Sequence, residues 1–167
     1  MKAENIIGPV EIVEKPERTY LGIKVQTPFP GMFAEATQAL RELRKWAKSN
    51  SVSEDGPYFI RYYHCDMSEI MEIEVGLFVP NGTSGDERIQ PGSMPKGRYA
   101  TLIYRGNGLR GNQALMKWAV DNGVKFEPID PNLKEFYVCR YEAYLTDYRV
   151  ESRKLLWDVE LSIKVID

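Results

Sequence analysis

Glu142 lies within a run of aromatic residues, 137–145, that has the composition of a strand. This carboxylate faces water on the open side of a sheet, or it lies inside an aromatic cavity. Removing an unpaired carboxylate from water costs several kcal/mol, so the second arrangement needs a partner of positive charge. A bound cation would supply it, and the faces of nearby tyrosine rings would attract the same cation. The simpler alternative is a solvated carboxylate paired with Arg140 or Arg61, because most charged side chains are exposed.

Other kinds of chemistry have little support in the sequence. The one histidine, His64, has no nucleophile motif beside it, which argues against a Ser–His or Cys–His triad. His64 and Cys65 form half of a metal site, but no second pair follows at ligand spacing. The glycines at 106, 108 and 111 lack the strand-to-helix fingerprint of a dinucleotide fold. We therefore expect no metal and no cofactor.

Composition indicates an ordinary globular chain that is rich in aromatic residues. Of its 167 residues 43% are hydrophobic and 28% charged, and it contains 10 Tyr, 6 Phe and 3 Trp. The net charge is −2 and no basic stripe is present, so nucleic acid is not an expected partner. No apolar run is long enough for a signal peptide or a membrane helix. We expect a cytoplasmic location and no membrane partner.

Hydrophobic periodicity divides the chain into strands and two helices. Residues 32–48 form one expected helix, because Ala36, Leu40, Leu43 and Ala47 recur on one helical face. Residues 109–122 form the second expected helix. Strands are expected over 10–13, 19–25, 58–65, 71–79, 97–104, 136–145 and 155–166. The segment 80–96 is rich in Gly, Pro and Ser and is interpreted as a linker.

The order of these elements predicts an internal duplication within a single domain that spans residues 1–167. Four short stretches of residues 10–80 have counterparts in residues 94–166, at offsets of about 79, 72, 79 and 86. Each half reads strand, helix, strand, strand, which predicts an α+β fold. We expect two antiparallel sheets joined about a pseudo-twofold axis, with a central ligand groove and the helices on the opposite face.

Three motifs resemble those of the GyrI-like family, the effector-binding domain of AraC- and MerR-type regulators. They are Met-Pro-Lys-Gly-Arg-Tyr-Ala at 94–100, Tyr-Arg-Gly at 104–106 and Tyr-Glu-Ala-Tyr-Leu-Thr-Asp at 141–147. The chain departs from the family pattern at Asn107-Gly108 and at Tyr148, where the family often has Pro-Tyr and Pro. Because the resemblance begins near Val10, we expect a stand-alone member that does not contact nucleic acid directly.

The resemblance implies a groove that binds amphipathic, cationic or aromatic small molecules, with Glu142 as its acidic centre. At an offset of 79, Tyr63 is the counterpart of Glu142 and is expected to approach it from the other half. Strand parity places Tyr144 with Glu142, and Phe59 with Tyr63. The remaining expected walls of the groove are Trp157, Tyr104 and Phe33.

Two alternative functions use the same residues. Similarity to hydrolases of electrophilic, cyclopropane-type toxins implies Glu142 as a general base and Tyr63 as an acid. Alternatively, the groove is covered by a protein partner, as implied by the gyrase inhibitors of this family. The sequence names no such partner, so binding of a small molecule is the favoured interpretation.

Overall fold

The computed structural model describes residues 4–133 and 136–166. Within them the chain forms a mixed α+β fold, as the sequence predicted. The elements, in chain order, are β1 (Ile6–Ile7), β2 (Glu11–Lys15), β3 (Arg18–Pro28), α1 (Met32–Ser49), β4 (Tyr58–His64), β5 (Ile70–Phe78), β6 (Gln90–Met94), β7 (Gly97–Arg105), α2 (Gly108–Asp121), β8 (Arg140–Tyr144), η1 (Lys154–Leu156) and β9 (Asp158–Lys164).

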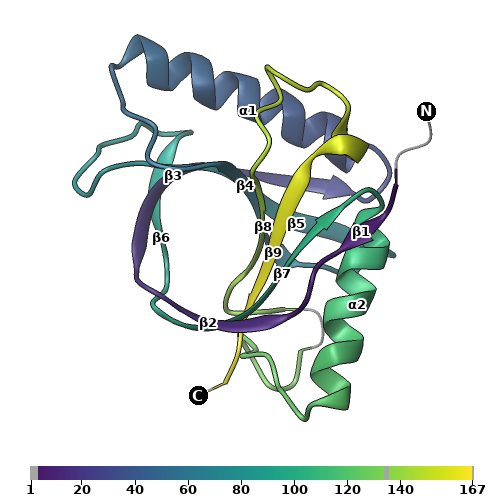
Figure 1. The fold of residues 1–167 in the computed structure, drawn as a ribbon. Coiled ribbons are helices and arrows are strands. Elements are labelled where there is room, and N and C mark those ends of the chain that lie inside the picture. The colour runs from purple at the N-terminus through teal and green to yellow at the C-terminus, as the bar shows by residue number, and fades with distance from the viewer. Residues whose placement is uncertain (1–3, 134–135, 167) are drawn as a thin grey trace.

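All the described strands belong to one antiparallel sheet that curls into a half-barrel (Figure 1). The order is β1-β7-β9-β8-β4-β5-β3-β6, and β2 also pairs with β7. The two halves of the chain meet where β4 lies beside β8, with Ile60 directly opposite Glu142. The expected joining of two antiparallel sheets is thus confirmed. That the two halves arose by duplication stays a prediction.

The segment 80–96, interpreted from sequence as a linker, contributes a strand of its own. Its β6 pairs with β3 of the first half, with Met94 opposite Arg18. In the same way β2, near the N-terminus, pairs with β7 of the second half, with Val13 opposite Tyr99. In Figure 1 these two strands lie at the left and lower sides of the opening of the half-barrel. The first half is therefore bordered by β6, which directly precedes β7 of the second half. The second half is bordered by β2, which directly precedes β3 of the first half.

The sheet has a helix face and an inner face. Both helices pack on the outer surface of the curl, α1 against β3 and β5, and α2 against β7 (Figure 1). Alternate side chains point to the inner face, where they form an aromatic core that includes Tyr20, Phe59, Phe78, Tyr99 and Tyr141. The helix face carries two further apolar clusters, one under each helix. Beside this aromatic core the inner face has a cavity of about 350 Å³, lined in part by Lys15 and Glu160.

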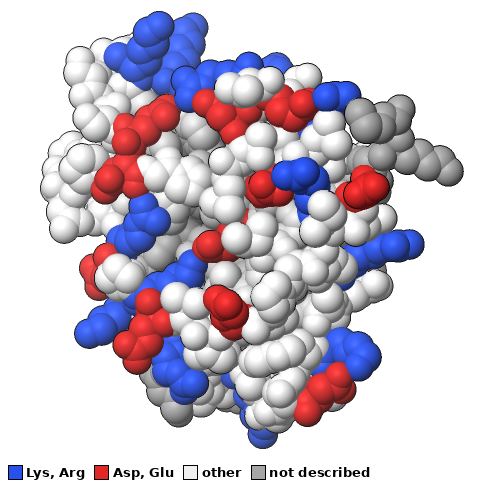
Figure 2. Space-filling view, viewed as in Figure 1, with Lys and Arg blue, Asp and Glu red and all other residues white. Residues whose placement is uncertain are grey.

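The character of the helices and the distribution of surface charge are two further features of the molecule. Neither described helix combines the length and the apolar character needed to span a bilayer. Acidic and basic side chains are interspersed over the face of the molecule in Figure 2, with wide uncharged areas between them.

Candidate ligand-binding site

A cavity of about 720 Å³ lies on the helix face, over the central strands β4 and β8. The expectation of a groove on the face opposite the helices was wrong. The helices cover the outer strands β3, β5 and β7 and leave the central strands uncovered, while the inner face carries the aromatic core and a smaller cavity of about 350 Å³. The cavity is lined by Phe29, Gly31, Met32, Phe33, Tyr62, Cys65, Met67, Met71, Tyr104, Asn107, Gly108, Leu109, Asn112, Gln113, Met116, Arg140, Glu142, Tyr144 and Lys154.

Both helices begin at this cavity. Before α1, Pro30 cannot extend the preceding strand, and Gly31 adopts a left-handed conformation with φ of 85°. Before α2, Gly106 also has a positive φ, 100°, and the side chain of Asn107 caps the helix by accepting a hydrogen bond from the Leu109 amide. These turns place the first residues of each helix, among them Phe33, at the mouth of the cavity.

Glu142 lies at the floor and is 7% exposed. Its Oε1 accepts a hydrogen bond of 2.9 Å from the Tyr62 hydroxyl on β4, and its Oε2 accepts one from the Tyr104 hydroxyl on β7. Burial, and then the negative charge of Glu142, raise the pKa of both tyrosines well above its usual value. The two hydroxyls therefore stay protonated and donate to the carboxylate, which partly compensates its removal from water.

An aromatic wall stands beside Glu142. The rings of Phe33, Tyr144 and Trp157 contact one another, with centroid distances of 6.1 Å for Phe33–Tyr144, 5.6 Å for Tyr144–Trp157 and 6.3 Å for Phe33–Trp157. Phe33 and Tyr144 line the cavity, whereas Trp157 supports them from behind and lines a neighbouring cavity of about 240 Å³. The Tyr144 hydroxyl is buried and forms no well-directed hydrogen bond with the described residues.

Two basic side chains also line the cavity, so its charge is mixed. Arg140 lies two residues before Glu142 on the same strand face; it donates to Asn112 Oδ1 at 2.6 Å, and its guanidinium lies 5.3 Å from the centre of the Tyr137 ring. Lys154 reaches across the mouth and places Nζ 4.7 Å from the centre of the Phe33 ring. That position, over an aromatic face, is one that attracts a cation.

Five of the residues predicted for the site come together: Glu142, Tyr144, Tyr104 and Phe33 line the cavity, and Trp157 lies behind them. Tyr63 and Phe59 do not, because the β4–β8 register puts them on the inner face. There Tyr63 donates to Glu74 at 2.7 Å, burial raises the pKa of Tyr63 to about 12, and Phe59 is fully buried in the aromatic core. The expected approach of Tyr63 to Glu142 was therefore wrong; its neighbour Tyr62 holds that position.

The sequence interpretation also missed the methionines. Four of the six in the chain line the cavity: Met32, Met67, Met71 and Met116. Methionine is flexible and polarisable, and it adapts to ligands of different shape. Met32 begins α1 and Met67 lies in the turn between β4 and β5, where hydrophobic periodicity carries little signal.

Comparison with solved structures supports the fold. The crystal structure of the EcmrR C-terminal domain superposes with a TM-score of 0.74 at 18% identity, over 96% of this chain and 98% of that one. In the EcmrR–DNA complex the TM-score is 0.76 at 18% identity; the match covers 94% of this chain but 57% of that one, so the chain spans just over half the length of that relative.

Two more distant structures share the fold. SAV2435 bound to tetraphenylphosphonium has a TM-score of 0.63 at 11% identity, over 95% of this chain and 94% of that one. A hydrolase from Listeria innocua has a TM-score of 0.64 at 12% identity, over 94% and 91%. No curated protein sequence is significantly similar to this chain. The family profile described as the GyrI-like small molecule binding domain, however, matches residues 8–165. The chain therefore belongs to the GyrI-like small-molecule-binding domain family.

Proposed function

We propose that this protein binds lipophilic aromatic cations in the cavity between the starts of α1 and α2. The observation that carries the proposal is the buried carboxylate of Glu142 at the floor of a cavity with aromatic and methionine walls. A carboxylate in that environment attracts positive charge, and the adjoining rings add favourable contacts with the same ligand. Tetraphenylphosphonium, present in the SAV2435 structure, is a compound of this class.

Several walls must act together to give useful affinity. A desolvated cation–π contact contributes about 2 kcal/mol, whereas micromolar binding requires about 8 kcal/mol. The rest comes from burying the apolar surface of the ligand against Phe33, Tyr144 and the four methionines. We therefore expect selection for aromatic, amphipathic ligands and weak binding of small inorganic or alkylammonium cations.

Lys154 occupies the position that a ligand's positive charge would take at the mouth. Its ammonium lies over Phe33, and a Cβ added at Gly108 would lie 3.9 Å from its Nζ, so it reaches the start of α2. A cationic ligand would displace this flexible side chain, which then moves into solvent. Arg140 is instead engaged by Asn112 and stays in place.

Calorimetric titration with tetraphenylphosphonium tests the proposal. The Glu142→Gln variant should bind at least about tenfold more weakly than the wild type, because close charge pairs at interfaces contribute about 1.5 kcal/mol or more. Glu72→Gln is the matched control: Glu72 is an exposed acid on β5 that accepts from Gln26 and lies outside the cavity. Equal affinity for the wild type and Glu142→Gln, with both proteins folded, would refute the role of the carboxylate.

The chemistry of the tyrosines favours binding over hydrolysis. Opening an electrophilic ring with Glu142 as base would need a nearby acid, and Tyr63 lies on the other face of the sheet. Tyr62 and Tyr104 are in position, but the pKa of each is raised, so each gives up its proton less readily than an ordinary tyrosine. Turnover of an epoxide probe that is lost in Glu142→Gln would favour the hydrolase instead.

A further inference from the structure

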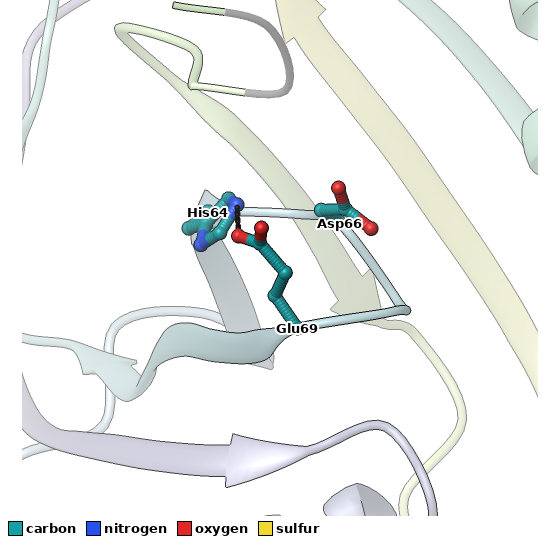
Figure 3. Close-up of side chains that lie close together, drawn as sticks. All are labelled: His64, Asp66 and Glu69. Atoms are coloured by element: carbon teal, nitrogen blue, oxygen red, sulfur yellow. Dashed lines mark ion pairs between the residues drawn. The ribbon is translucent and has the colours of Figure 1, made fainter.

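The turn between β4 and β5 brings together three side chains of the kinds that bind metals. His64 ends β4, and Asp66 and Glu69 follow it in the turn (Figure 3). One ligand atom from each lies within 4.8 Å of the other two. The sequence interpretation looked for Cys and His pairs and did not consider carboxylates two and five residues after the histidine.

The imidazole of His64 is held in one orientation. It is buried, and its ring stacks on Phe136, with 4.2 Å between the centroids and 11° between the planes. Its Nε2 points toward Oε2 of Glu69, as the dashed line in Figure 3 marks. The buried, stacked His64 would therefore be a ligand in a fixed position, whereas the exposed Glu69 carboxylate can move toward an ion.

The distance between His64 Nε2 and Glu69 Oε2 suits a bridging metal ion better than a hydrogen bond. Nε2 and Oε2 are 3.5 Å apart, which is longer than a good hydrogen bond. Ligand atoms about 2.1 Å from a tetrahedral zinc ion lie roughly 3.4 Å from each other. A zinc ion therefore fits between them with little movement of either side chain.

Asp66 supplies the third ligand from within the turn. Its Oδ1 accepts hydrogen bonds from the Ser68 amide at 2.9 Å and the Ser68 hydroxyl at 2.6 Å. These bonds fix the carboxylate beside the other two side chains, and neither of them uses Oδ2. The long reach of the exposed Glu69 side chain can close the remaining distance.

We propose that His64, Asp66 and Glu69 form a binding site for a divalent transition-metal ion, with zinc as the preferred ion. Three protein ligands leave one tetrahedral position for water. One imidazole and two carboxylates favour a first-row transition ion over magnesium, which prefers all-oxygen octahedral sites. The neighbouring Cys65 and Met67 line the mouth of the large cavity, so a bound ion would fix that side of the mouth.

Because the chain has a single histidine, the imidazole nitrogen signals in an NMR spectrum of the labelled protein report on this site alone. Titration with zinc chloride should move these signals and saturate at one ion per chain, and magnesium chloride should not move them. Calorimetry of Glu69→Gln should show zinc affinity at least about tenfold weaker, since even residues that only support metal ligands contribute that much. Glu69 is largely exposed, so this variant should fold even if His64→Gln does not.

Two control variants separate this site from others. Glu72→Gln removes a nearby exposed acid, and Cys65→Ser removes the adjacent thiol; both should keep the zinc affinity of the wild type. Imidazole signals unchanged by zinc, or zinc affinity that is lost in Cys65→Ser but kept in Glu69→Gln, would overturn the proposal. None of these measurements uses a ligand of the large cavity, so their outcome is independent of the function proposed above.

Discussion

The Tyr62 hydroxyl on β4 donates a 2.9 Å hydrogen bond to Glu142 on β8, across the line where the two halves of the sheet meet. The floor of the cavity is therefore built from both halves of the chain. Tyr104, from β7, donates to the other oxygen of the same carboxylate. The hydrogen bond from Tyr62 depends on the β4–β8 register, whereas the one from Tyr104 depends on the pairing of β9 with β7 and with β8.

Tyr62 and Tyr63 make a matched pair for testing this relationship. Each donates to a buried carboxylate, Tyr62 to Glu142 and Tyr63 to Glu74, but on opposite faces of the sheet. Tyr62→Phe and Tyr63→Phe should each lower the free energy of unfolding, by about 1–3 kcal/mol, because a buried acceptor loses a donor. Urea denaturation measures that loss. Only Tyr62→Phe should also change the affinity for tetraphenylphosphonium; an equal effect of Tyr63→Phe on binding would argue against the assigned faces.

The overall fold follows from the sequence because its signals are local. Helical and strand periods are set by neighbours a few residues apart, so both helices and the long strands were predicted close to their observed bounds. Glu142 and its aromatic surroundings were also predicted, through the short motif around residue 142. The side of the sheet on which the cavity lies depends instead on how far each helix extends over the sheet, which no local pattern reports.

The error over Tyr63 has a definite physical origin. Leu77 and Ile163 are 86 residues apart, the offset that the sequence assigns to β5 and β9. Leu77 pairs with Tyr58 on β4, and its equivalent Ile163 pairs with Arg140 on β8, so Tyr58 and Arg140 are equivalent positions. The residue numbers of equivalent positions on β4 and β8 therefore differ by 82 (140 − 58) and not by 79. An odd error in register exchanges the two faces of a strand. Because the assumed offset was wrong by three residues, the sequence analysis placed Tyr63 on the same face as the Glu142 carboxylate.

Gly111 on α2 lies close against the ring of Tyr104. A Cβ at this position would lie 2.6 Å from Cδ1 of the Tyr104 ring, which is itself fully buried. Gly111→Ala should push the ring away from Glu142, cost about 1–3 kcal/mol by overpacking and weaken tetraphenylphosphonium binding. In a Tyr104→Leu background the same change should cost less, because the ring is absent. Additive costs in the two backgrounds, measured by urea denaturation, would show that Tyr104 is not the group displaced.

Removing the charge of Lys154 should strengthen the binding of cations. Lys154→Gln vacates the face of Phe33 and removes a like charge, so tetraphenylphosphonium should bind about twofold to fivefold more tightly, as expected for a partly exposed cation–π contact of about 0.5–1 kcal/mol. Lys117→Gln is the control, because Lys117 is exposed on α2 and pairs with Asp121. Calorimetry showing weaker binding by Lys154→Gln would mean that this lysine contacts the ligand favourably.

High pH should destabilise the fold. Burial is the chief cause of a raised pKa at seven of the described tyrosines: Tyr20, Tyr58, Tyr62, Tyr63, Tyr99, Tyr104 and Tyr144. In the unfolded chain these groups ionise near pH 10, but in the folded protein only at higher pH. The free energy of unfolding should therefore keep this contribution below about pH 10 and lose it as the pH rises further.

Spectroscopy can follow that change directly. Ultraviolet absorbance of tyrosinate should show these seven tyrosines ionising only above pH 10, together with unfolding. Chemical denaturation at a series of alkaline pH values should give a falling free energy of unfolding over the same range. Titration of all ten tyrosines near pH 10 without unfolding would contradict the buried hydroxyl network.

The most direct test of the central claim compares two ligands of the same shape and opposite charge. Tetraphenylphosphonium and tetraphenylborate present the same four rings, so their affinities, measured by calorimetry on the wild type and on Glu142→Gln, isolate the effect of charge. We predict that the wild type prefers the phosphonium and that Glu142→Gln loses this preference. Tighter binding of the borate by the wild type would show that Arg140 and Lys154 dominate the cavity, and would contradict the claim that Glu142 selects cations.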